Sequence, residues 1–126
     1  MNIDNLYKDI KVKDGDFLVF GCSYGPDSMA LFKTLLEYRK KINIVLVCAH
    51  VNHDKRRESA KEKEDLEYFC KTNNVIFEYM KIEKYGDDNF HNEARNIRYQ
   101  FFDEVVKKYN AKYLLTAHHG DDLMET

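Results

Sequence analysis

Short apolar runs alternate with longer segments of mixed polarity along this chain of 126 residues. The runs are rich in β-branched and aromatic residues, which predicts strands. They are Phe17–Gly21, Ile44–Ala49, Val75–Ile82 and Tyr113–Ala117. Between them, apolar residues recur every three to four positions, which predicts helices. These segments are Ser28–Lys41, Glu58–Thr72 and Ala94–Tyr109.

This alternation predicts an α/β fold, an open, doubly wound parallel sheet with helices on both faces. The continuous apolar run Ile44–Ala49 is typical of a central strand that is buried on both sides. In such sheets, ligands bind beyond the carboxyl ends of the strands, where the strand order reverses. Functional residues are therefore expected just after each run.

The turn after the first run is the most informative segment. Residues 21–28 read Gly-Cys-Ser-Tyr-Gly-Pro-Asp-Ser, and Pro26 is the only proline in the chain. A proline suits the first turn of a helix, whose free N–H groups and dipole attract phosphate. The Walker A loop and the G-x-G-x-x-G loop are both excluded by the sequence. A turn that merely caps a helix remains the alternative.

Composition narrows the class of protein. The chain is 44% hydrophobic and has a net charge of −2, so it fits one globular domain without the basic excess typical of nucleic-acid binding. No apolar run approaches the roughly 20 residues that span a bilayer, and no signal peptide is visible. Three cysteines without a C-x-x-C pair predict reduced thiols in a cytoplasmic protein.

Histidines gather after two of the predicted strands. His50, Asn52 and His53 follow the second run, and His118 and His119 follow the fourth. Such clustering indicates a site, although polar strand ends in contact with water give the same pattern. Zinc is disfavoured, because adjacent histidines point apart and no cysteine–histidine spacing fits.

Charged residues complete the candidate set. Asp122 and Glu125 are three residues apart in what looks like the start of a fourth helix, where they would share one face. They could bind an ammonium group, act as a base or coordinate Mg²⁺, or simply compensate the helix dipole. Arg95 and Arg98 lie on one side of the third helix and could bind a phosphate or form surface ion pairs.

Together, these motifs resemble a known family. The loop Ser23–Ser28 is similar to the Ser-Gly-Gly-x-Asp-Ser loop of the N-type ATP pyrophosphatases, or PP-loop family, whose fold is adenine nucleotide alpha hydrolase-like. The order of the later motifs resembles the N-terminal catalytic domain of the tRNA(Ile)-lysidine synthetases. These motifs are residues 50–53, Glu93-Ala94-Arg95 with Arg98-Tyr99, and residues 117–126. The resemblance covers nearly the whole chain from about Asp16 onward, and it implies a truncated, single PP-loop domain without the tRNA-binding C-terminal domains.

The resemblance implies an ATP-dependent ligase that makes lysidine in two steps. ATP adenylates the C2 carbonyl oxygen of the wobble cytidine of tRNA(Ile), and pyrophosphate leaves. The amine of free L-lysine then attacks C2 and displaces AMP. On its own, this chain is expected to bind ATP weakly and to modify no tRNA.

The same resemblance assigns roles to residues. The nucleotide-binding residues would be Ser23, Tyr24, Gly25, Pro26, Asp27 and Ser28 at the phosphates, and His50, Asn52 and His53 on the adenine side. Asp27 would also help to bind Mg²⁺, and Arg95 or Arg98 would stabilise the α-phosphate. His118 would lie near the reacting centre, and Asp122 and Glu125 would bind lysine and help to deprotonate it.

Tyr24 departs from the family pattern, because it stands where the family has a glycine. It either adopts a positive φ at a cost of about 1 kcal/mol or keeps an ordinary φ and stacks on the nucleotide. Residues 54–57, Asp-Lys-Arg-Arg, match the Gly-Leu-Arg-Gly of the family only at Arg56. Lys55, Arg56 and Arg57 would touch tRNA phosphate or form a solvated loop. A tRNA-thiolating PP-loop enzyme and a non-catalytic nucleotide-binding module remain the alternatives.

A further expectation concerns the edge of the sheet. If the sheet of the family continues beyond the fourth strand, Tyr113–Ala117 or a neighbour is left as an open edge. Open edges pair with other chains, so we expect this chain to self-associate in isolation.

Overall fold

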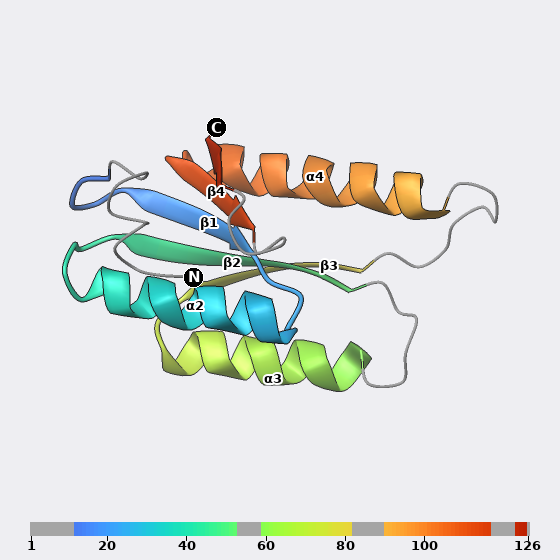
Figure 1. The fold of residues 1–126 in the computed structure, drawn as a ribbon, viewed down its shortest axis with the longest axis horizontal. Coiled ribbons are helices and arrows are strands. Elements are labelled where there is room, and N and C mark those ends of the chain that lie inside the picture. The colour runs from blue at the N-terminus through green and yellow to red at the C-terminus, as the bar shows by residue number, and fades with distance from the viewer. Residues whose placement is uncertain (1–11, 53–58, 82–89, 117–122, 126) are drawn as a thin grey trace.

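The computed structural model describes residues 12–52, 59–81, 90–116 and 123–125 (Figure 1). Strands and helices alternate as the sequence predicts, up to the fourth strand. The elements are β1 (Phe17–Gly21), α2 (Pro26–Arg39), β2 (Val45–Asn52), α3 (Ser59–Thr72), β3 (Ile76–Lys81), α4 (Phe90–Tyr109), β4 (Tyr113–Thr116) and β5 (Leu123–Glu125).

The strands form one sheet in the order β3-β2-β1-β4-β5. The first four strands are parallel, with Gly21 of β1 opposite Ala49 of β2 and Thr116 of β4. The predicted parallel α/β sheet is therefore confirmed for β1 to β4. Its order reverses beside β1, because β2 and β3 extend to one side of β1 and β4 lies on the other.

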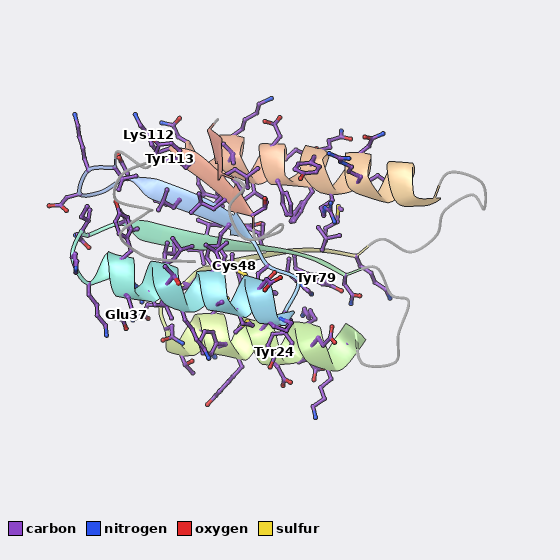
Figure 2. All side chains as sticks on the ribbon, viewed as in Figure 1. Tyr24, Glu37, Cys48, Tyr79, Lys112 and Tyr113 are labelled. Atoms are coloured by element: carbon purple, nitrogen blue, oxygen red, sulfur yellow. The ribbon has the colours of Figure 1, made fainter. Side chains whose placement is uncertain are left out.

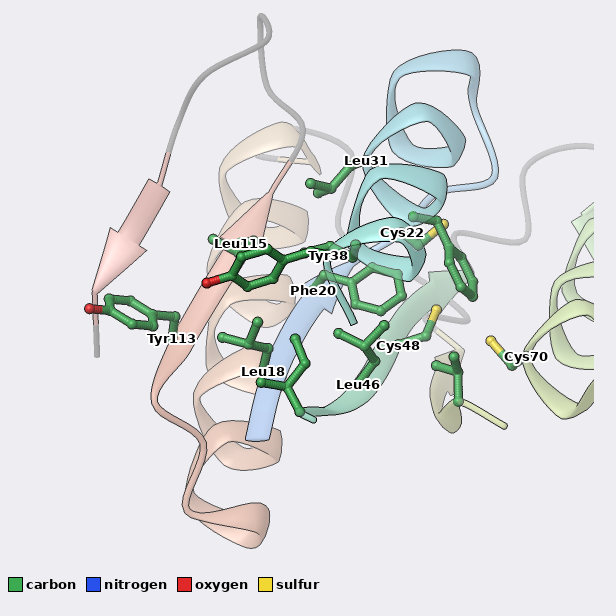
Figure 3. Packing of buried hydrophobic residues seen from close by; sticks show 14 of the residues in the cluster. Leu18, Phe20, Cys22, Leu31, Tyr38, Leu46, Cys48, Cys70, Tyr113 and Leu115 are labelled. Atoms are coloured by element: carbon green, nitrogen blue, oxygen red, sulfur yellow. The ribbon is translucent and has the colours of Figure 1, made fainter. Parts of the chain in front are cut away.

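Helices cover both faces of the sheet, as predicted. Figure 1 shows α2 and α3 on one face and α4 on the other. Side chains of β1 alternate between the two layers: Leu18 and Phe20 pack under α2, whereas Val19 packs with Phe102 of α4. Figure 3 shows the first of these two cores, where Phe20 lies among residues from α2, β2 and β4. Burial on both faces explains why β1 has no polar side chain.

The end of β1 lies unusually close to α4. A Cβ atom added at Gly21 would lie 2.7 Å from Cζ of Phe102, a separation that real Cβ atoms essentially never show. Glycine at this position therefore lets the ring of Phe102 cover the last residue of β1. This contact limits how closely α4 can approach the carboxyl end of β1.

Helices α3 and α4 end in similar ways. Asn74 and Asn110 follow α3 and α4 with φ of 55° and 52°. After each of them, the next residue donates its N–H to a carbonyl five residues back, Val75 to Cys70 and Ala111 to Val106. Asparagine tolerates this left-handed conformation better than most residues, so both helices end with a satisfied cap.

The sequence misjudged the last segment. Leu123–Glu125 forms strand β5, which pairs antiparallel with β4, rather than the predicted fourth helix. The open edge of β4 offers unpaired N–H and C=O groups, and pairing with β5 satisfies them. The predicted exposed edge at Tyr113–Ala117 is thus wrong for β4 itself, and β5 takes its place at that side of the described sheet.

Within the described residues, no helix is both long enough and apolar enough to cross a membrane.

The close approach of α4 to β1 generates a test. We expect Gly21→Ala to lower the free energy of unfolding by about 1–3 kcal/mol, because the new methyl group overlaps the ring of Phe102. Urea denaturation measures this loss.

Phe102→Leu is the matched partner variant, because it removes the ring that the methyl group would meet. In the double variant, the Gly21→Ala substitution should cost clearly less than it does alone. Equal costs in both backgrounds would show that the contact with Phe102 does not set the size of residue 21.

Candidate functional site

The turn between β1 and α2 lies at the point where the strand order reverses. β1 has β2 on one side and β4 on the other, and all three end at the same edge of the sheet. The backbone of Cys22 continues the pairing, since its N–H donates to the Ala49 carbonyl at 3.0 Å. This is the place where open parallel sheets bind ligands, as the sequence predicted.

Helix α2 begins with donors that are available to a ligand. Gly25 is its N-cap residue, Pro26 occupies the first turn, and no side chain caps the helix. The Ser28 hydroxyl instead accepts the Ser23 N–H at 3.2 Å and lies 3.0 Å from the Ser23 hydroxyl. The first N–H groups of the helix are therefore left for an anion, which the positive end of the helix dipole also attracts.

Tyr24 adopts the left-handed conformation, with a φ of 65°. This is the first of the two alternatives that the sequence left open for the position. The side chain of Tyr24 is half-buried and packs against the core under α2 (Figure 2). Its backbone N–H lies against the Cys22 sulfur. The turn thus keeps a conformation that costs a tyrosine roughly 1–2 kcal/mol.

His50 supports the turn from the neighbouring strand. Its Nδ1 lies 2.7 Å from the Cys22 carbonyl oxygen, which can only accept, so Nδ1 carries the proton and donates it. The ring stacks on Phe77 and Tyr79 of β3. Burial lowers the pKa of His50, which keeps the imidazole neutral. His50 therefore holds the backbone of the loop in place.

His50 and Asn52 lie within β2 and not after it, because β2 continues three residues beyond its predicted end. Both side chains are buried, and Asn52 Nδ2 donates to the Tyr79 hydroxyl at 3.3 Å. Sequence reasoning missed Tyr79, which pairs with both residues, because nothing along the chain shows which strand lies beside β2. His53 lies outside the described residues.

Three buried thiols lie in the hydrophobic cluster on the face of the sheet covered by α2 and α3. Figure 3 shows Cys22, Cys48 and Cys70 within the apolar cluster, and all three are free. Burial raises the pKa of Cys48 well above its usual value, whereas a hydrogen bond with Cys48 lowers the pKa of Cys22. The packing agrees with the prediction that Cys22 fills space in the core.

The two arginines of α4 differ in their surroundings. Arg95 is exposed, whereas Arg98 is half-buried, and both guanidinium groups lie against the ring of Tyr99. Arg98 lies one helical turn before Phe102, whose ring covers Gly21. It is therefore the arginine beside the carboxyl end of β1, and its Nε is buried without a hydrogen-bond partner among the described residues.

Thr116 is a polar residue that the sequence prediction did not include. It is the last residue of β4, it is 3% exposed, and its hydroxyl has no hydrogen-bond partner in the described part of the chain. Its position opposite Gly21 places it beside the loop. A hydroxyl residue closing an apolar strand was the available signal, but only the sheet order shows what lies next to it.

The predicted lysine-binding carboxylates are not brought together on one helix. Glu125 lies on β5 opposite Tyr113, which is the amino-terminal end of β4 and thus the far end from the loop. The premise that Glu125 shares a helix face with Asp122 is therefore wrong. Asp122 and His118 lie outside the described residues, so their predicted roles stay predictions.

Asp27 is the candidate metal ligand that the structure describes. Its carboxylate is exposed in the first turn of α2, beside the free N–H groups. The described residues hold no group of three or more His, Cys, Asp or Glu side chains that could bind a metal. A single carboxylate fits Mg²⁺, which proteins commonly bind through one or two carboxylates together with substrate phosphates.

Comparison with known proteins agrees with this geometry. Residues 1–126 match the family described as the PP-loop domain. The chain is 44% identical over 110 residues to a tRNA(Ile)-lysidine synthase from Ureaplasma parvum, a match covering 82% of this chain and 31% of that protein. It is also 39% identical over 134 aligned positions to a tRNA(Ile)-lysidine synthase from Bacillus cereus, covering 98% of this chain and 28% of that protein.

The chain thus spans about a third or less of the length of these relatives. Among solved structures, it resembles the U34-tRNA thiolase NcsA from Methanococcus maripaludis, described with its [4Fe-4S] cluster, with a TM-score of 0.74. That match covers 92% of this chain and 43% of the thiolase at 20% identity, and it shows a shared fold.

The left-handed conformation of Tyr24 generates a direct test. We expect Tyr24→Gly to be more stable than Tyr24→Ala by about 1 kcal/mol, because both variants lose the ring but only glycine adopts positive φ without strain. Chemical denaturation of the two variants measures the difference. If alanine proves as stable as glycine, the residue does not hold a positive φ in solution.

The buried His50 predicts a pH dependence. Burial lowers the pKa of His50 below the ordinary histidine value of about 6.5, so the unfolded chain binds the proton more tightly, and stability falls as pH decreases below about 6.5. We expect His50→Asn, which can still donate to the Cys22 carbonyl, to show a shallower loss between pH 7 and pH 5. Denaturation across this range compares the two proteins, and identical slopes would contradict the prediction.

Proposed function

Because the chain belongs to the PP-loop domain family, we propose that it is the ATP-binding part of an enzyme that joins lysine to the wobble cytidine of tRNA(Ile). The observation that carries this proposal is the turn after β1. It combines an uncapped helix start with the reversal of strand order, which together favour a bound phosphate chain. The other substrates and the second step are inferred from the relatives named tRNA(Ile)-lysidine synthase.

The proposed reaction has two steps. The C2 carbonyl oxygen of the cytidine attacks the α-phosphorus of ATP, the bond from that phosphorus to the bridging oxygen breaks, and pyrophosphate leaves. The lysine amine, after losing a proton to a base, then attacks C2. The C2–oxygen bond breaks with AMP as the leaving group, which gives lysidine. ATP, L-lysine and tRNA(Ile) are the proposed substrates, and cytoplasm is the proposed compartment.

The loop residues would hold the phosphates that leave. The N–H groups at the start of α2 point away from the helix, and the Ser23 and Ser28 hydroxyls, 3.0 Å apart, line the same turn. Because His50 fixes the Cys22 carbonyl, the donors are already oriented before a ligand binds. Such preorganised donors stabilise charge that develops on a leaving group without further rearrangement.

Mg²⁺ would bind beside this loop. Asp27 is exposed and adjacent to the phosphate donors, so it would contribute one carboxylate oxygen. When bound, Mg²⁺ neutralises charge on the phosphate oxygens. Arg98, beside the end of β1, would face the same developing charge from the opposite layer. Arg95 is exposed, so the structure gives less support to a role for Arg95 at the α-phosphate than to one for Arg98.

The thiolating alternative draws no support from the cysteines of this chain. Cys22, Cys48 and Cys70 are buried within the hydrophobic cluster under α2, where they pack against apolar side chains. The second alternative is a nucleotide-binding module without catalysis. Self-association through β3 or β5, at the two sides of the described sheet, remains part of the proposal.

The whole protein that contains this chain provides the test of function. It is mixed with ATP, tRNA(Ile) and lysine, and the release of AMP is measured with and without lysine. Release of AMP that requires both lysine and tRNA supports the proposal. AMP release that is indifferent to lysine favours the thiolating alternative, and nucleotide binding without any release favours the non-catalytic module.

A variant of Asp27 tests the loop itself. We expect Asp27→Asn to slow pyrophosphate release about 10²-fold, because it removes the charge that would hold Mg²⁺ beside the phosphates. Asp65→Asn, at an exposed position of α3, is the matched control and should leave the rate unchanged. Equal rates for the two variants would remove Asp27 from the proposed site.

A further inference from the structure

Two buried polar atoms in the described part of the chain have no hydrogen-bond partner, and both lie near the end of β1. They are the Thr116 hydroxyl and the Arg98 Nε. A buried donor without a partner costs about 1–3 kcal/mol, and native proteins contain few such groups. Two of them near the end of one strand call for a shared explanation.

The sheet places both groups on one face. Leu114 packs in the cluster under α4, and Thr116, two residues along β4, faces the same way. Its neighbour on that face is Gly21, which has no side chain and is covered by Phe102. Arg98 lies one turn before Phe102, on the side of the carboxyl ends. Thr116 and Arg98 thus flank the last residue of β1 from β4 and from α4.

This face is opposite to that of the phosphate loop. The loop leads into α2, which covers the other face of the sheet, as Figure 1 shows. The end of β1 therefore has phosphate donors on one side and two unsatisfied polar atoms on the other. Arg98 Nε can only donate a hydrogen bond, and the Thr116 hydroxyl can donate as well. An oxygen that carries negative charge satisfies both.

We propose that Thr116 binds the nucleotide directly, as part of a second subsite that it forms with Arg98 for an α-phosphoryl oxygen. This inference rests on the proposed use of ATP. Cleavage between the α- and β-phosphates gives two products, pyrophosphate and an adenylyl group, so separate contacts to each are expected. The loop at α2 holds the pyrophosphate, and Thr116 with Arg98 holds the phosphoryl group that stays with the adenosine.

The Thr116 hydroxyl should affect the stability of the free protein and its affinity for the nucleotide in different ways. In the free protein, the unsatisfied hydroxyl of Thr116 lowers the free energy of unfolding. An apolar group of the same shape should therefore be tolerated or favoured there. In the complex, the same hydroxyl contributes a hydrogen bond to a charged group. Removing it should therefore affect stability and affinity in opposite directions.

Two substitutions at Thr116 separate these effects in the whole protein that contains this chain. Thr116→Val keeps the shape without the hydroxyl, so we expect an equal or higher melting temperature but about tenfold weaker binding of ATP and AMP. Thr116→Ser keeps the hydroxyl and loses the methyl group, so it should melt earlier and bind within about twofold of the wild type. Calorimetric titration and thermal unfolding give both values.

Controls localise the effect to the α-phosphoryl group. Pyrophosphate, which occupies only the loop, should bind the wild type and Thr116→Val equally. Thr34→Val, at a threonine of α2 whose hydroxyl donates to the Ala30 carbonyl, is the matched substitution and should leave ATP binding unchanged. Combining Thr116→Val with Arg98→Lys should weaken AMP binding by less than the product of the single effects, because both residues contact one group.

The outcomes distinguish this inference from the proposed function. Unchanged AMP affinity in Thr116→Val, in a protein that binds ATP and releases AMP with lysine, overturns the subsite and leaves the function standing. Weaker pyrophosphate binding with unchanged AMP binding overturns the assignment to the α-phosphoryl group. A wild-type protein that binds no adenine nucleotide overturns both proposals.

Discussion

Parallel pairing of β1 with strands on both of its sides is the constraint on which the rest of the structure depends. β2 and β4 take up the hydrogen bonds of β1, and α2 and α4 cover its two faces. The side chains of a strand enclosed in this way must be apolar. Polar groups that could contact a ligand can therefore occur only after the end of the strand. The loop after Gly21 is therefore the first position at which the chain presents polar groups to a ligand.

Several residues around this loop adopt locally unfavourable states, and the stability of the surrounding core offsets the free energy that these states cost. Tyr24 holds a left-handed conformation, and Thr116 and Arg98 bury polar atoms without partners in the described residues. Each cost is of the order of 1–3 kcal/mol. The hydrogen bond between His50 and the Cys22 carbonyl keeps the loop in this state. Strain and unsatisfied groups that cluster at one edge of a sheet are typical of functional sites, where proteins tolerate such local costs.

The sequence predicted those parts of the site that depend on neighbours along the chain. The first strand, the turn and the helix start at Pro26 were predictable from an apolar run, small residues and one proline. His50 was predicted as a site residue, but its role in holding the Cys22 carbonyl required β1 and β2 to be placed side by side. Glu125 was misjudged, because its three-residue spacing from Asp122 resembled a helix, whereas pairing with β4 decided its conformation.

The amino-acid sequence by itself determined the alternation of strands and helices and the chemistry of the loop. Both follow from local periodicity, from the fixed φ of proline and from the polarity of neighbouring residues. The tertiary structure alone decided which groups face the end of β1 from β4 and α4. Thr116 and Arg98 are eighteen positions apart by their residue numbers, and only the strand order and the contact of Phe102 with Gly21 bring both to that edge. Contacts between distant segments depend on packing, and no local pattern records them.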